Sequence, residues 1–198
     1  MEFRLPLSLV LLVACLPLIG CPVSSQHPVY TERDAVVEPG LEGTWVDPES
    51  HDKGEITFQK SGDHEYTMAS LAPDSKISQN YKVHLVRLGD QLFMDLIFEN
   101  QTLNGEALGT PLGVFTAHII MKVKVSGDDL AYATLEDDAI QKPHSFWGGS
   151  PLDYQVTDEN VLVTAQTDDL RRYISDHTDT LFSDSQHLKR KGKTATQP

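Results

Sequence analysis

Hydrophobic and polar residues alternate in short segments along most of the chain after residue 42. Segments such as 55–59 place apolar side chains at every second position, the pattern of a β-strand with one buried face. Glycine with aspartate or serine separates several of these segments, which is the chemistry of tight hairpin turns. The pattern therefore predicts an antiparallel β-meander that closes into a barrel or half-barrel. The predicted strands are residues 43–46, 55–59, 65–68, 81–86, 91–98, 114–125, 130–135 and 160–165.

One α-helix is predicted near the C-terminus, at residues 167–177. Thr167 suits the N-cap, and the two aspartates that follow it suit the positive end of the helix dipole. One helical face carries the residues spaced i, i+3, i+4 and i+7, which are Leu170, Tyr173, Ile174 and His177. Residues 186–188 are expected to add a final contact or an edge strand.

Two of the predicted strands are apolar on both faces, over residues 92–98 and 114–123. This composition indicates that the helix or another element covers their outer face. The connections at residues 99–113 and 137–158 are long for hairpins. The second connection contains the aromatic pair Phe146-Trp147, which we expect either to cover an open end of the core or to contact a ligand.

The N-terminal segment has the pattern of an export signal. Residues 5–19 are largely apolar, but as a helix they span only about 22 Å, less than the roughly 30 Å of a bilayer core. Leu18-Ile19-Gly20-Cys21 has the form of a lipobox, so residues 1–20 are predicted to be a cleaved signal peptide and Cys21 to be the lipidated N-terminus. A second lipobox-like run ends at Cys15 and is the alternative cleavage site.

Composition divides the mature chain into three parts. Residues 21–40 contain three prolines and few apolar residues, so we expect a flexible tether. Residues 41–188 form one β domain, and residues 189–198 are expected to be a basic, disordered tail. The net charge of −13 argues against binding to nucleic acid, so membrane attachment is expected to come from the lipid. With Cys21 lipidated, the mature chain has no internal disulfide.

Gly43-Thr44-Trp45, at the first predicted strand, resembles the Gly-x-Trp motif that opens lipocalins, some of which are bacterial lipoproteins. Two later lipocalin signatures, a Thr-Asp-Tyr turn and an arginine before the last strand, are not evident. Residues 92–96, 120–125 and 163–165, the last followed by a helix, resemble uncharacterised bacterial lipoproteins with such a domain. The resemblance implies a lipocalin-like barrel or half-barrel with one C-terminal helix. It also implies that Trp45 packs across the closed barrel end, and it assigns no activity.

Motifs for catalysis or metal binding are not found in the sequence. The chain has eight histidines, but none are spaced to place two imidazoles on one face, so no metal and no cofactor are predicted. No Gly-x-Ser-x-Gly elbow is present, and no residue is assigned as catalytic. An envelope hydrolase that uses carboxylates or His118 is the enzymatic alternative.

We therefore expect a membrane-tethered cell-envelope lipoprotein that is a non-catalytic binding or structural module. Pro22, in place of aspartate after the cysteine, favours the outer membrane if the cell has one. The barrel is expected to hold a small apolar ligand, with a protein-interaction module in envelope assembly as another alternative. The candidate ligand-binding residues are Phe93, Ile97, Phe115, Ile119, Phe146 and Trp147.

Overall fold

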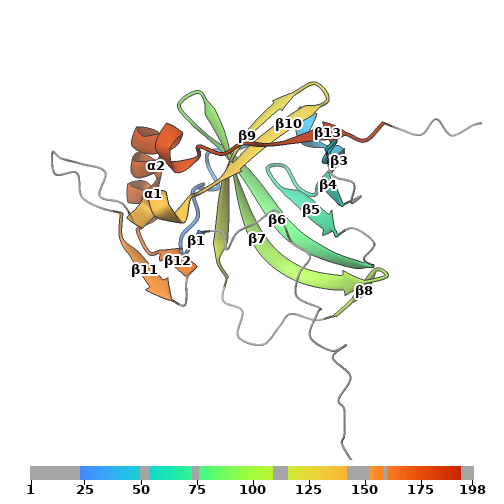
Figure 1. The fold of residues 1–198 in the computed structure, drawn as a ribbon, viewed down its shortest axis with the longest axis horizontal. Coiled ribbons are helices and arrows are strands. Elements are labelled where there is room, and N and C mark those ends of the chain that lie inside the picture. Colours follow the sequence, from blue (N-terminus) through green and yellow to red (C-terminus); the bar gives the residue numbers. More distant parts are fainter. Residues whose placement is uncertain are drawn as a thin grey trace, which may run out of the picture.

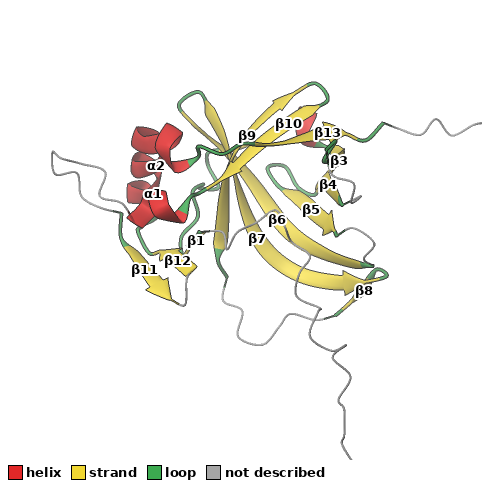
Figure 2. Ribbon diagram, viewed as in Figure 1, coloured by secondary structure: helices red, strands yellow, loops and turns green. Residues whose placement is uncertain are grey.

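A computed structural model of the chain describes residues 23–49, 54–72, 76–108, 116–141, 152–157 and 160–192. Strands predominate, and eight of them form a closed antiparallel barrel (Figures 1 and 2). The helices α1 and α2 and the strands β11 and β12 lie on one side of this barrel, at the left of Figure 1. The predicted fold class, a mainly-β lipocalin-like barrel with a C-terminal helix, is confirmed.

The barrel strands follow one another in sequence order, and each is antiparallel to its neighbours. The short strand β8 (Glu106–Ala107) pairs only with β7 and lies outside this cycle. The last barrel strand pairs with the first through Arg190 and Trp45, so the segment expected to be a final contact or an edge closes the barrel. The eight strands are β3 (Gly43–Val46), β4 (Glu55–Lys60), β5 (Tyr66–Leu71), β6 (Ile77–Leu88), β7 (Gln91–Leu103), β9 (His118–Ser126), β10 (Asp129–Thr134) and β13 (Gln186–Arg190).

Two hairpin turns have the predicted glycine chemistry. Gly89 joins β6 to β7 and Gly127 joins β9 to β10, with φ angles of 62° and 61°. Residues other than glycine rarely adopt this left-handed backbone conformation. Both turns are two residues long. The turns hold each pair of strands in register.

Aromatic and aliphatic side chains fill the barrel interior. Trp45 and Tyr66 are fully buried there. Because inward and outward side chains alternate along each strand, the interior set takes every second residue of β7: Leu92, Met94 and Leu96. The remaining buried members are Leu41, Phe58, Met68, Tyr81, Val83, Leu85, Met121, Val123, Leu130, Tyr132 and Leu188.

A single turn of 3₁₀ helix, η1 (Pro39–Leu41), closes one end of the barrel. Leu41 is fully buried, and its carbonyl accepts a hydrogen bond of 2.9 Å from the Trp45 indole. The Arg190 guanidinium lies 4.2 Å from the centre of the Trp45 ring and donates to the Gly40 carbonyl. Trp45 is thus a core residue, as the lipocalin resemblance implied. The predicted tail boundary at residue 189 is wrong, because Lys189 and Arg190 belong to β13; residues 193–198 lie outside the described residues.

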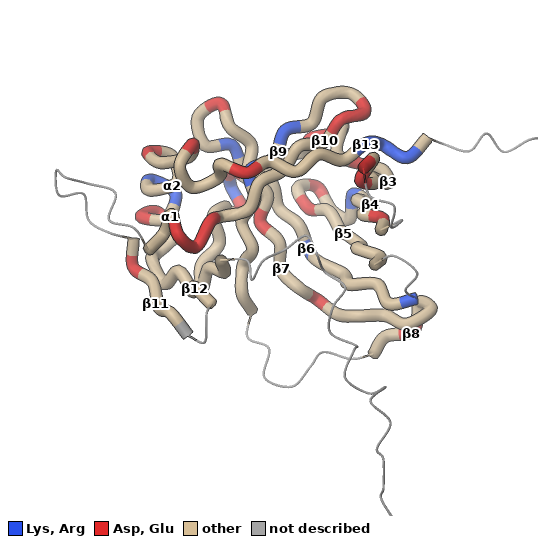
Figure 3. The backbone as a smooth tube through the Cα atoms, in the orientation of Figure 1, with Lys and Arg blue, Asp and Glu red and all other residues tan. Residues whose placement is uncertain are grey.

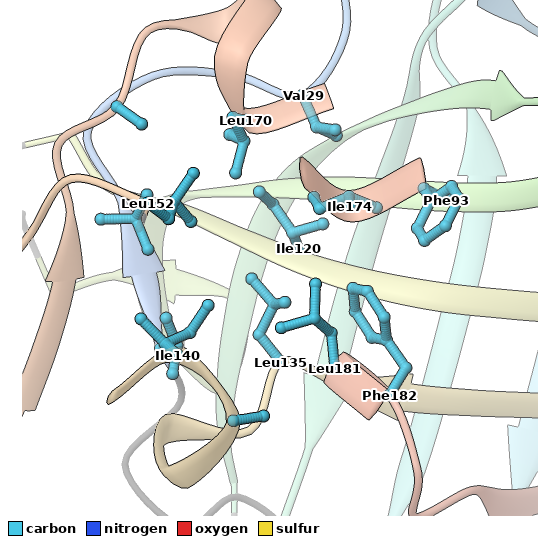
Figure 4. Packing of buried hydrophobic residues seen from close by; sticks show 14 of the residues in the cluster. Val29, Phe93, Ile120, Leu135, Ile140, Leu152, Leu170, Ile174, Leu181 and Phe182 are labelled. Carbon is cyan, nitrogen blue, oxygen red and sulfur yellow. The ribbon is translucent and has the colours of Figure 1, made fainter. Parts of the chain in front are cut away.

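Helix α2 (Thr167–Leu181) packs against the outer face of the barrel. Its buried residues Leu170 and Ile174 face Ile120 and Phe93, which point outward from β9 and β7 (Figure 4). The prediction that an element covers these two strands is therefore confirmed. The helix begins near the expected residue, but Thr167 is not its N-cap. Its hydroxyl donates instead to the carbonyl of Pro28, at 2.9 Å.

Three further elements, α1, β11 and β12, complete the outer layer. The sequence pattern did not predict α1 or β11. Helix α1 (Asp137–Gln141) buries Ala139 and Ile140 in the same cluster as α2. The hairpin of β11 (Tyr154–Thr157) and β12 (Asn160–Val163) lies beside it, and β12 matches a predicted strand. The loop expected at residues 137–158 thus contains α1 and β11.

The segment expected to be a flexible tether is packed on the barrel from Val23 onward. Val23 and Val29 are buried, at 1% and 0% exposed. β1 (Ser24–Ser25) is parallel to β12 and antiparallel to β9, and β2 (Ala35–Val36) is antiparallel to β6. The prediction of a tether at residues 21–40 is wrong for the described part, because backbone pairing and two valines hold it. We refer to residues 23–37 as the strap.

Among the described residues, no helix is long and apolar enough to cross a membrane.

Candidate functional site

Three of the six residues predicted to bind an apolar ligand, Phe93, Ile97 and Ile119, are described, and they do not face one common space. Phe93 points outward, and its ring centre lies 5.4 Å from that of Phe182 beneath α2. Ile97 has the same parity on β7 and is partly buried, whereas Ile119 packs against the interior cluster. Phe115, Phe146 and Trp147 lie outside the described residues. The structure therefore separates Phe93 from Ile119 by the wall of the barrel.

Polar groups gather instead on the outer face, where the strap crosses β6, β7 and β9. Asp95 is the centre of this region and is completely buried. One of its carboxylate oxygens lies 2.6 Å from Nδ1 of His118, and the other accepts a hydrogen bond of 2.9 Å from the backbone N–H of Val29. A buried carboxylate needs such partners to offset its loss of solvation. Asp95 thus joins two barrel strands to the strap.

Helix α2 holds the strap from its other side. Arg171 donates to the carbonyl of Val29 at 3.2 Å and forms an ion pair with Asp34. Burial acts to raise the pKa of Asp34, but hydrogen bonds from Thr31 and Arg171 and the charge of Arg171 outweigh it and lower the pKa. The position of Val29 is therefore set by Asp95 on its N–H and by Arg171 on its carbonyl.

A polar pocket opens beside the strap, with a volume of about 310 Å³. The Tyr30 ring stacks on the His84 imidazole, with ring centres 4.0 Å apart and planes 12° from parallel. Glu65 places one carboxylate oxygen 3.6 Å from Nε2 of His84 and 3.5 Å from the Lys82 ammonium. The residues that line the pocket are Tyr30, Glu32, Ala35, Gly62, Asp63, His64, Glu65 and His84.

Burial determines the protonation of the two stacked rings. It is the largest cause of the lowered pKa of His84, and it outweighs the neighbouring charges of Glu65 and Asp95, which act to raise that pKa. The pKa of Tyr30 is raised, first by burial and then by the charges of Asp95, Glu65 and Glu32. Nδ1 of His84 is buried and has no hydrogen-bond partner among the described residues. At neutral pH both rings are therefore uncharged.

Ser25, His118 and Asp95, which lie together on the outer face, do not have the geometry of a catalytic triad. Ser25 pairs with His118 in the register of β1 and β9, and His118 contacts Asp95, so the three residue types of a triad are neighbours. However, the Ser25 hydroxyl donates to the carbonyl of His27 at 2.7 Å, and Ser25 is completely buried. A nucleophile must instead give its proton to the histidine and be open to substrate. These residues hold the strap in place.

Metal binding has no geometric support in the described ranges. No group of three or more His, Cys, Asp or Glu side chains there comes close enough to hold a metal ion.

Sequence reasoning missed most of this region. Asp95 carried one detectable signal, because a lone aspartate in the apolar segment 92–98 needs a buried partner. His118 was identified only as a strand histidine and as a candidate for the enzymatic alternative. Tyr30 and Glu65 lie far apart in the sequence, and nothing in their spacing indicates that they face one pocket.

Comparison with known proteins adds no relative from which a site could be transferred. No family model matches the chain, and neither a curated protein nor a solved structure was found that matches it. The protein class rests on the closed eight-stranded antiparallel barrel and its outer layer.

Proposed function

We propose that this protein is a lipid-anchored lipoprotein of the cell envelope, and that its barrel is a non-catalytic module whose binding surface lies on the outside. The observation that places the binding surface on the outside is the filled interior: Trp45, Tyr66 and Leu85 are completely buried among their own neighbours. A barrel packed in this way is a rigid support. The polar pocket beside the strap is open, so a ligand can reach it.

The lipid anchor rests on the lipobox at Cys21 and on no other observation. The strap adds a consequence, because only Pro22 separates Cys21 from the buried Val23. The reach between the Cα atoms of Cys21 and Val23 is at most about 7 Å. A lipid on Cys21 therefore holds the barrel directly at the membrane, in the outer membrane where one is present.

Fractionation of cells that express the wild type or Cys21→Ser tests whether Cys21 anchors the protein to the membrane. We expect the wild type in the membrane fraction with the added mass of a lipid, and the variant in a soluble fraction without that mass. Cys15→Ser is the matched control and should behave as the wild type. A Cys21→Ser variant that stays membrane-bound with unchanged mass would contradict the anchor.

A protein-interaction module is the second candidate, and exposed apolar side chains favour it. The hairpin of β6 and β7 is 12 and 13 residues long and continues into β8. At the end of the hairpin that lies next to β8, four large apolar residues are between 38% and 53% exposed: Leu71, Ile77, Leu103 and Leu108. Crosslinking in cells through position 103 distinguishes the two functions. Capture of an envelope protein at this position, and loss of that capture in Ile77→Ser, would favour the protein-interaction module.

A further inference from the structure

We propose that the pocket between Tyr30, Glu65 and His84 binds a small organic ammonium ion of the size of a diamine. This inference rests on the proposed function as a binding module and names the ligand class of its outer surface.

The charge of the pocket wall supports a cationic ligand. Three carboxylates line it, from Glu32, Asp63 and Glu65, and no lysine or arginine is among the described lining residues. Figure 3 shows the acidic positions in the turn between β4 and β5, which forms one side of the pocket. Lys82 contacts Glu65 from outside the pocket at 3.5 Å, and its side chain is 39% exposed. An exposed ion pair of this kind contributes little, so Glu65 keeps most of its attraction for a ligand.

The aromatic side of the pocket is uncharged and polar. Because burial keeps the His84 imidazole neutral, it adds no positive charge that would oppose an ammonium ion. Burial is the largest cause of the raised pKa of Tyr30, and the charges of Asp95, Glu65 and Glu32 add to it. The Tyr30 ring, stacked on His84, forms this wall of the pocket without a positive charge. Neither ring therefore opposes the attraction of the carboxylates for an ammonium ion.

The size of the site distinguishes an organic cation from a metal ion. A metal ion needs three or more ligands within about 2.0–2.6 Å, and no such group exists among the described residues. The carboxylates are instead distributed around a space of about 310 Å³, at the lower limit of small-molecule sites. A diamine has an ammonium group at each end and can donate hydrogen bonds to two of the carboxylates that line this space.

Isothermal titration calorimetry of the full chain in detergent, with 1,4-diaminobutane at low salt, tests the site. We expect binding by the wild type and a loss of about tenfold or more in affinity for Glu65→Gln, since a hydrogen bond to a charged group is removed. Glu106→Gln is the matched control. It removes the same charge from an exposed position on β8 and should change the affinity by less than about twofold. 1,4-Butanediol, which has no charge, should not bind.

Glu32→Gln provides a second variant in case Glu65→Gln does not fold, which circular dichroism reveals. It should also weaken diamine binding more than Glu106→Gln does. The inference is overturned if the wild type binds no diamine, if all three variants lose affinity equally, if butanediol binds as well, or if only Ca²⁺ or Zn²⁺ binds. Loss of the diamine site with intact Cys21-dependent membrane attachment would overturn this inference and leave the anchor standing.

Discussion

At the scale of single residues, two histidines on the outer face have different roles. His118 lies against the buried carboxylate of Asp95, at 2.6 Å, and so belongs to the structure that holds the strap. His84 lies under the Tyr30 ring with one nitrogen unpartnered. Strand register alone does not give this difference. Asp95 is directly opposite His84 on β6 and Ile120 on β9, yet its carboxylate contacts His118, two residues before Ile120.

Asp95→Asn should destabilise the fold by about 1–3 kcal/mol, because the amide keeps only one acceptor oxygen, whereas the carboxylate uses one oxygen for the Val29 N–H and the other for His118. Urea unfolding followed by circular dichroism measures the loss. Asp176→Asn, the same change at an exposed position of α2, should alter stability by less than about 0.5 kcal/mol. Equal unfolding midpoints for the two variants would show that Asp95 does not support the strap.

The lowered pKa of His84 predicts a pH dependence of stability. The unfolded chain binds a proton at this residue near pH 6.5, whereas the folded chain binds it only at lower pH. The stability that neutral His84 contributes is therefore complete above about pH 6.5, and it is lost as the pH falls toward the pKa of His84 in the folded chain. The lowered pKa of Asp34 acts below its ordinary value of 3.8, outside this window.

Urea midpoints at pH 8 and pH 5 measure this effect. The wild type should lose stability on acidification, and His84→Phe, which keeps a ring beneath Tyr30 but cannot be protonated, should lose less. His187→Phe, at an exposed position of β13, is the control and should follow the wild type. An unchanged pH dependence in His84→Phe would assign the effect to other groups.

At the scale of elements, α2 fixes the strap to the barrel. The helix presents an apolar face to β7 and β9, with Leu170, Ile174 and Leu181 fully buried, and places Arg171 toward the strap. Hydrophobic burial thus positions the helix, and polar contacts from Arg171 and Thr167 attach the strap to it. The spacing of Leu170 and Ile174 could be recognised in the sequence, but the partner of Arg171 could not.

Arg171→Ala should loosen the strap without opening the barrel. Its side chain is 22% exposed and contacts both Asp34 and the Val29 carbonyl, so we expect a loss of about 1–2 kcal/mol and faster hydrogen exchange at residues 29–36. Exchange on β6 and β7 should stay slow. Arg172→Ala is the matched control, since Arg172 is 70% exposed and pairs with Asp169 on the same helix. Equal exchange in the two variants would contradict the role of Arg171.

At the scale of the whole molecule, the sequence predicted the barrel but not what is attached to its outside. Residues 55–59 have the period-two pattern of a half-buried strand, and residues 91–98 form a largely continuous apolar run. These patterns predict β4 and β7. The strap has no such pattern. Its strands are two residues long, too short for an alternating pattern of side chains to reveal them, and backbone pairing and a few buried side chains hold them. The pocket was missed for a related reason, because Tyr30, Glu65 and His84 meet only once the strap is in place.

The packed strap also predicts how closely the protein approaches the membrane. With Val23 buried and Cys21 lipidated, the barrel should lie within about 10 Å of the lipid headgroups, because the Cα atoms of these two residues are at most about 7 Å apart. Insertion of twenty Gly-Ser residues between Pro22 and Val23 should add about 25 Å of mean separation and leave the thermal midpoint unchanged. Energy transfer from a fluorophore on an exposed β13 position to a labelled lipid measures the separation. Equal transfer with and without the insertion would mean that the native chain already holds the barrel away from the surface, as the tether expected from composition would do.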